Sequence, residues 1–223
     1  ERYDIVNRII SLGRDQHWRR RALKQVGIPQ GARVLDVASG TGDLAIMVRE
    51  RYDAKQVIGT DLTPAMLRIA QQKVAGIDLP LTVSDGLALA FVDGHFDVVM
   101  SSFMMRNIPD VGQALGEHNR VLKEEGRMVC LEITWPRSFP MNVLFKLYFF
   151  GFPQLVGTVL SRQREAYRYL PRSVERFMAP EEMEDEIRAA GFEDIETNLM
   201  MLGTVALYTA TKCHSLPTGG QRE

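Results

Sequence analysis

Three aspartates and a glycine-rich turn are the residues whose types and spacing most clearly suggest chemistry. Asp36 interrupts an apolar run, and Gly40-Thr41-Gly42 begins four residues later. Glycine lets the backbone approach a ligand closely, and the amides at the start of a following helix are free to meet a polar group. Asp61 and Asp85 end two later apolar segments. The pattern predicts a cofactor cradle made of a strand, a turn and a helix start.

The position of Asp36 narrows the choice of cofactor. Residues 40–45 satisfy G-x-G-x-x-A, which is the dinucleotide fingerprint. In a dinucleotide site the glycine turn follows its strand directly and receives a pyrophosphate, which a carboxylate beside it would repel. A nicotinamide oxidoreductase is therefore the least favoured reading. An acid here suits a cationic ligand that carries an amino-acid moiety.

The other two acids extend this interpretation to the rest of the ligand. Asp61 has the spacing expected for gripping ribose hydroxyls, and Asp85 could accept from an adenine amino group. Met66 could pack on the adenine face. Together these groups describe S-adenosylmethionine, which has no phosphate. The alternatives are helix caps or turn formers for the two acids and a core methionine for Met66. The cofactor-binding residues predicted at this point are Asp36, Gly40, Gly42, Asp61, Met66, Asp85 and Gly86.

The elements that must position these residues alternate between strands and helices. Strands are predicted at 33–38, 56–60, 81–83, 96–101 and 127–133, and helices at 43–51, 64–75, 111–122 and 180–190. Thr63 is the candidate cap of the second of these helices, with Pro64 at its first position. Two further strands, 195–201 and 204–211, are close enough for a hairpin. The pattern predicts an α/β fold with a doubly wound, mostly parallel, seven-stranded Rossmann-like sheet and an antiparallel C-terminal hairpin strand.

One domain is expected to cover residues 1–213, followed by a flexible tail at 214–223. Residues 1–30 form a predicted helical cap, whose basic run His17–Arg21 is either a solvated face or a contact for phosphate or an anionic membrane. Residues 136–180 form a predicted helical lid insertion. Lys146 and Pro153 interrupt its apolar run, so a membrane span is not expected. The lid could cover an apolar pocket or make a dimer contact.

Composition and charge exclude several other classes of function. The chain has 223 residues with 45% hydrophobic and 25% charged residues, so disorder throughout is not expected. Its net charge of -1 provides no field for nucleic acid. Cys130 and Cys213 form neither a disulfide framework nor a metal spacing, so no metal is expected. No signal peptide is evident, and a cytoplasmic setting fits the cysteine usage.

Several segments together resemble the ubiquinone/menaquinone biosynthesis C-methyltransferase family, which belongs to the class I methyltransferases that use S-adenosylmethionine. Residues 36–43 resemble the first motif of that class, and the match runs from Tyr3 to Lys212. Met104 and Met105 stand where the family has Gly and Leu, which widens the range of substrate shapes. The other matching segments are Tyr3-Asp4, Ser102-Phe103, Arg106-Asn107, Arg120-Val121-Leu122-Lys123, Glu132, Tyr167-x-Tyr169-Leu170-Pro171 and Ala190-Gly191-Phe192.

The resemblance implies methyl transfer from S-adenosylmethionine to a ring carbon of a reduced, prenylated quinone precursor, with S-adenosylhomocysteine as the product. It implies that Arg106, Asn107 and Tyr3 act on the substrate hydroxyl, and that Thr41 and Ser102 contact the cofactor. The residues alone leave open a salt bridge from Arg106 to Asp110, and simple packing for Tyr3. Other small apolar acceptors and a non-catalytic subunit of a quinone-synthesis complex are the alternatives. Peripheral membrane contact and a homodimer are compatible with this reading.

Overall fold

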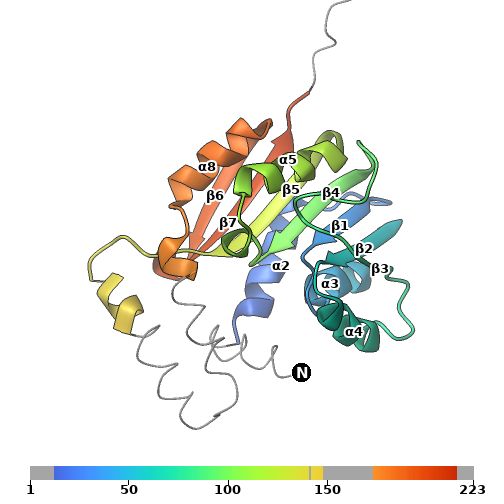
Figure 1. Cartoon of the computed structure of the whole chain (residues 1–223), viewed down its shortest axis with the longest axis horizontal. Coiled ribbons are helices and arrows are strands. Elements are labelled where there is room, and N and C mark those ends of the chain that lie inside the picture. Colours follow the sequence, from blue (N-terminus) through green and yellow to red (C-terminus); the bar gives the residue numbers. More distant parts are fainter. Residues whose placement is uncertain (1–12, 141, 148–172, 215–223) are drawn as a thin grey trace, which may run out of the picture.

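A seven-stranded sheet forms the centre of the molecule (Figure 1). The computed structural model describes residues 13–140, 142–147 and 173–214. The strand order is β3-β2-β1-β4-β5-β7-β6, and only β7 runs antiparallel to its neighbours. The strands are β1 (Arg33–Val37), β2 (Gln56–Asp61), β3 (Leu81–Val83), β4 (Phe96–Ser102), β5 (Leu122–Ile133), β6 (Phe192–Met200) and β7 (Val205–Lys212).

Helices cover both faces of the sheet, which makes three layers (Figure 1). Side chains of α2 and α3 share one core cluster with β1, and side chains of α5 and α8 share the other with β4. Because β4 is covered on both sides, all its residues except Asp97 and Ser102 are buried. The helices are α2 (Asp15–Val26), α3 (Asp43–Arg51), α4 (Pro64–Lys73), α5 (Val111–Val121) and α8 (Pro180–Ala189), with 3-10 turns η1 (Met105–Asn107) and η2 (Met201–Gly203).

The predicted doubly wound sheet with an antiparallel C-terminal strand is confirmed. The prediction was wrong at two strand boundaries. Strand β5 begins at Leu122 because Leu122 pairs with Phe96 before the ladder resumes at Arg127 and Val98, so residues 123–126 form a bulge within the strand. Strand β6 begins at Phe192, which pairs with Lys212.

The start of α4 also differs in one detail from the prediction. Pro64 occupies the first turn of the helix as expected, but the Thr63 side chain makes no capping hydrogen bond. Instead, the Thr63 amide donates to Asp61 Oδ1 over 2.7 Å. Asp61 and Thr63 therefore form a local Asx-type turn that precedes the helix.

The predicted N-terminal cap and lid are described only in part. Residues 1–12, most of the lid and the tail from 215 lie outside the described residues. Residues 142–147 and 173–176 are helical. No helix in the described ranges is long and apolar enough to cross a membrane.

His118 creates a testable pH dependence in the core. It is fully buried on α5, and burial lowers its pKa from 6.5 to about 4. Between these values the unfolded chain binds a proton that the folded protein excludes, so stability falls as the pH falls. We expect this residue to reduce the free energy of unfolding by about 3 kcal/mol from pH 6.5 to pH 4. Urea denaturation across this range measures the loss, and His118→Leu should flatten the slope.

The exposed His17 supplies the matched control for this measurement. His17→Leu removes an imidazole that lies in solvent, and it should leave the slope of the wild-type protein unchanged. An identical slope in the wild-type protein and in His118→Leu would contradict the assignment to the buried ring.

Candidate cofactor and substrate site

The side chain of Asp36 holds the start of α3, just after the glycine turn that follows β1. Its carboxyl group is fully buried, and Oδ2 accepts a hydrogen bond from the Ala45 amide over 3.1 Å. Burial raises the pKa of Asp36 to about 8, against the lowering effect of the Arg19 charge. The second oxygen, Oδ1, has no partner among the described residues. Asp36 therefore caps the first turn of α3, where a helix has amides without intrahelical acceptors.

A second aspartate fixes the turn from the side of β2. Gly40 and Gly42 have φ angles of 57° and 83°, which favour glycine over residues with a Cβ. The Gly40 amide donates to Asp61 Oδ2 over 2.9 Å. On the other flank, Lys73 Nζ donates to Thr41 Oγ1 over 2.8 Å and to Asp43 Oδ1 over 2.9 Å. Neighbouring elements thus hold the turn by side-chain contacts.

A cavity of about 310 Å³ opens beside this turn. Its volume falls at the lower end of the range for small-molecule sites, about 300–1,000 Å³. The walls come from α2, the turn after β1, the end of β2 and the segment after β4. The lining residues are Asp15, Arg19, Ala38, Ser39, Gly40, Thr41, Asp43, Asp61, Leu62, Thr63, Met66, Ser102, Phe103, Met104, Asn107 and Ile108.

Only some of the predicted site residues line the cavity. The predicted residues that line it are Gly40, Thr41, Asp61, Met66, Ser102 and Asn107. The predicted residues that do not line it are Asp36, Gly42, Asp85, Gly86 and Arg106. Tyr3 lies outside the described residues. The assignment of these side chains to the cofactor and the substrate stays a prediction.

The loop after β3 carries two of the predicted residues outside the cavity. Asp85 is exposed, and its Oδ1 accepts from the Leu87 amide over 2.9 Å. Gly86 lies against Met104, because a Cβ built on Gly86 would come within 2.3 Å of the methyl group of Met104. Met104 itself lines the cavity. The loop therefore supports the cavity wall from outside through the contact of Gly86 with Met104. The hydrogen bond of Asp85 agrees with the alternative that this residue forms a turn.

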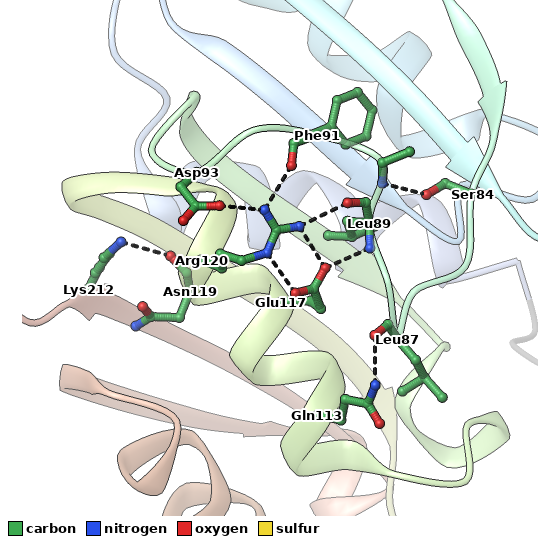
Figure 2. Close-up of polar contacts among 11 residues, drawn as sticks. Ser84, Leu87, Leu89, Phe91, Asp93, Gln113, Glu117, Asn119, Arg120 and Lys212 are labelled. Atoms are coloured by element: carbon green, nitrogen blue, oxygen red, sulfur yellow. Dashed lines mark hydrogen bonds and ion pairs between the residues drawn. The ribbon is translucent and has the colours of Figure 1, made fainter.

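Arg120 attaches this loop to α5 (Figure 2). Its Nε and Nη2 donate to the two carboxylate oxygens of Glu117, each over 2.7 Å. Nη1 donates to the Phe91 carbonyl and to Asp93, and Nη2 also donates to the Leu89 carbonyl. The Arg120 guanidinium lowers the pKa of Glu117. All five donors of one side chain are thereby committed to holding the loop.

The segment after β4 is strained at Phe103, which has a φ of 59°. Such an angle is an outlier for a bulky residue, and outliers of this kind gather at functional sites. The Phe103 carbonyl accepts from Arg106 Nη1 over 3.0 Å and from Asn107 Nδ2 over 2.8 Å. Its ring lies 5.4 Å from the Arg19 guanidinium carbon and 5.7 Å from that of Arg106. The strained residue thus organises the neighbouring polar side chains.

Arg106 forms a buried ion pair with Glu132 of β5. The two side chains are only 7% and 0% exposed. A salt bridge was the alternative left open for Arg106, and the structure forms one, but with Glu132 and not with Asp110. Asp110 instead caps α5 by accepting from the Gln113 amide over 2.8 Å. The sequence marked Glu132 as part of a family segment without indicating its partner. Arg106 therefore has a neutralised guanidinium behind the cavity wall.

Sequence reasoning missed the contribution of α2 to the cavity. Asp15 and Arg19 lie one helical turn apart on its buried side, and both line the cavity. The available signal was the 4-residue spacing of opposite charges beside the buried Trp18, which identifies a helix face turned inward.

The comparisons with known proteins agree with this architecture. Residues 1–212 match the model of the ubiE/COQ5 methyltransferase family. The demethylmenaquinone methyltransferase of Thermus thermophilus is 41% identical, over 95% of this chain and 96% of its own. The ubiquinone/menaquinone biosynthesis C-methyltransferase UbiE of Desulfotalea psychrophila is 37% identical, over 95% and 86%.

Solved structures support the fold. The phosphoethanolamine N-methyltransferase 2 of Haemonchus contortus, in complex with S-adenosyl-L-methionine, superposes with a TM-score of 0.68 at 17% identity, over 89% of this chain and 53% of its own. The fold is the Rossmann-like α/β fold of methyltransferases. The chain belongs to the ubiE/COQ5 methyltransferase family, and it is an S-adenosylmethionine-dependent methyltransferase.

The residues present fit this cofactor. Gly40 lines the cavity, and a Cβ built on it would meet no atom within 4 Å, so the turn leaves open space for a ligand. The buried and unpartnered Asp36 Oδ1 adds an unmet acceptor beside the same turn. The cavity walls are lined by carboxylates and hydroxyls, which suit an amino group and ribose hydroxyls.

Removal of the Arg120 side chain, which holds the loop after β3, should lower the stability of the protein. In Arg120→Met five hydrogen bonds disappear and Glu117 loses its counter-charge, so we expect the free energy of unfolding to fall by about 2 kcal/mol. Urea denaturation measures this, and amide hydrogen exchange should accelerate at Ala90. Arg188→Met is the control, because Arg188 pairs with Asp185 on an exposed helix face. It should change stability by less than about 0.5 kcal/mol. Equal losses of stability in both variants would contradict the stabilising role given to the Arg120 contacts.

A matched pair of glycine variants tests the cradle. Gly40→Ala places a methyl group in the open space beside the cavity, so we expect S-adenosylhomocysteine to bind at least about tenfold more weakly by calorimetry. Gly94 has a φ of 62° and equally open surroundings, but it does not line the cavity. Gly94→Ala should carry the same backbone cost, about 1–2 kcal/mol, with unchanged affinity. The cradle assignment fails if both variants bind like the wild-type protein.

Proposed function

We propose that this enzyme methylates a ring carbon of a reduced, prenylated quinone precursor. The observation that carries the proposal is that two segments of the chain line one cavity. The glycine turn supplies one wall, and the segment 102–108 after β4, which matches the substrate-side motif of the family, supplies the other. The names of the relatives in Thermus thermophilus and Desulfotalea psychrophila support a demethylmenaquinol or a demethylated ubiquinol precursor as the acceptor.

The chemistry asks little of the protein beyond alignment and proton removal. S-adenosylmethionine supplies a methyl group on a sulfonium, which is already electrophilic. Loss of the phenolic proton raises the electron density at the neighbouring ring carbon, which forms the new C–CH3 bond as the sulfur keeps the electron pair. The ring then loses the proton of that carbon to water. The site must place the two reactants in line, exclude bulk water and stabilise the phenolate.

Asn107 is the residue we assign to the acceptor, and Arg106 supports it. Asn107 is exposed into the cavity, and the Phe103 carbonyl holds its side-chain amide. Arg106 lies one residue earlier, behind the cavity wall, and it donates to the same Phe103 carbonyl, so we assign it to positioning Asn107 and the neighbouring segment. Glu132 holds the Arg106 guanidinium in place. Tyr3 completes the set through the resemblance, from outside the described residues.

Three exposed apolar residues within the predicted lid suit the tail of such a substrate. Phe139, Leu144 and Leu147 are 82%, 54% and 66% exposed. Large apolar side chains gathered on a surface are typical of a contact with a partner or a lipid. We assign them to the prenyl tail and to peripheral contact with the bilayer that holds it. A homodimer through the same surface stays a prediction.

A panel of acceptors tests the function. We expect radiolabelled methyl transfer from S-adenosylmethionine to demethylmenaquinol or to a demethylated ubiquinol precursor, with the label on a ring carbon. Tails of increasing length should be tested with and without anionic vesicles. Long-tailed acceptors should react faster with vesicles present. Absence of transfer to every quinol, together with transfer to another small acceptor, would overturn the proposal.

The same assay tests the role of Asn107. Asn107→Ala should lower kcat by about 100-fold, as expected for a group that positions a proton transfer. Asn142→Ala is the control, because Asn142 is a second asparagine that does not line the cavity. Unchanged kcat in Asn107→Ala would remove this residue from the proposed mechanism.

A further inference from the structure

Arg19 is a buried cation at the cavity that the mechanism above does not use. It belongs to α2, and its side chain is 10% exposed, although it lines the cavity together with Asp15. A structural arginine–carboxylate pair on a helix normally lies on the solvent side, where it costs little. Burying this pair costs desolvation energy that good geometry alone rarely recovers. The position therefore points to a ligand.

The hydrogen bonds of Arg19 leave one edge of its guanidinium unused. Nη1 donates to Asp15 Oδ2 over 3.0 Å. Within the described part of the chain Nε is buried and has no acceptor, and no hydrogen bond is formed by Nη2. The Nε–Nη2 edge is one of the two edges that grip a carboxylate with two parallel bonds. The face of the guanidinium lies over the Phe103 ring, which limits its rotation.

Side chains of the opposite charge line the same cavity. Asp43 and Asp61 line it together with Arg19. A ligand in this cavity therefore meets both a cation with an unused donor edge and carboxylates. A zwitterionic amino-acid group suits such a site, because its carboxylate and its ammonium meet opposite partners.

We propose that Arg19 binds the α-carboxylate of the methionyl part of the cofactor through its Nε–Nη2 edge. Asp15 acts as a positioning residue, since it holds Nη1 and so orients the guanidinium. The inference rests on the use of S-adenosylmethionine by this enzyme, and it assigns the recognition of its amino-acid end to a helix that precedes the first strand.

Binding of three ligands to one variant tests this assignment. S-adenosylhomocysteine has the carboxylate, its decarboxylated analogue lacks only that group, and 5′-methylthioadenosine lacks the whole amino-acid end. By calorimetry, Arg19→Gln should weaken S-adenosylhomocysteine about 10- to 100-fold, the value of a charge-assisted pair. It should change the other two ligands by less than about threefold. Arg19→Lys keeps the charge without the fork and should show an intermediate loss.

Arg21→Gln is the control, since Arg21 is an exposed cation on the same helix. It should leave all three affinities unchanged. The proposal is overturned if Arg19→Gln weakens S-adenosylhomocysteine and its decarboxylated analogue by the same factor, because that result indicates a structural role. It is also overturned if no ligand is weakened. Failure of the wild-type protein to bind S-adenosylhomocysteine would overturn the use of this cofactor, which distinguishes the two failures.

Discussion

The side chains of Asp36 and Asp61 hold the turn between β1 and α3, and the rest of the site depends on that turn. Asp36 accepts the Ala45 amide from beneath, and Asp61 accepts the Gly40 amide from the neighbouring strand. Without these acceptors, a glycine turn at positive φ would leave polar backbone groups unsatisfied near the core. Because the acceptors come from two adjacent parallel strands, the sheet register sets the shape of the cavity.

The ion pairs around the cavity fix the positions of side chains more than they stabilise the fold. Arg106 pairs with Glu132, and Arg19 pairs with Asp15, in both cases with little exposure to water. Buried ion pairs of this kind contribute little net stability, but removal of one partner is costly. Each pair therefore holds a guanidinium in one place. The Phe103 ring lies within cation–π distance of both guanidinium groups, so one aromatic side chain links the two ion pairs.

The loop after β3 shows how a segment with little secondary structure obtains a defined position. Arg120 and Glu117 of α5 bind its backbone at several points, so the loop is held by a helix that follows it in the chain. The loop in turn packs Gly86 on Met104. Helix α5 thus holds the loop, and the loop holds the lining side chain of Met104. Such support suits a site that must keep its shape while a ligand enters.

The sequence by itself determined the fold class, the glycine turn and the strand ends that carry acids, because these depend on local periodicity and on residues close together in the chain. It did not determine the boundary at Leu122, since a bulge depends on pairing with the neighbouring strand. Only the tertiary structure decided that Asp36 turns to a helix amide and that Arg106 meets Glu132, which is 26 residues away. It also brought Arg19 to the cavity. Side-chain partners of this kind depend on helix rotation and strand register, which are set by packing across the whole core.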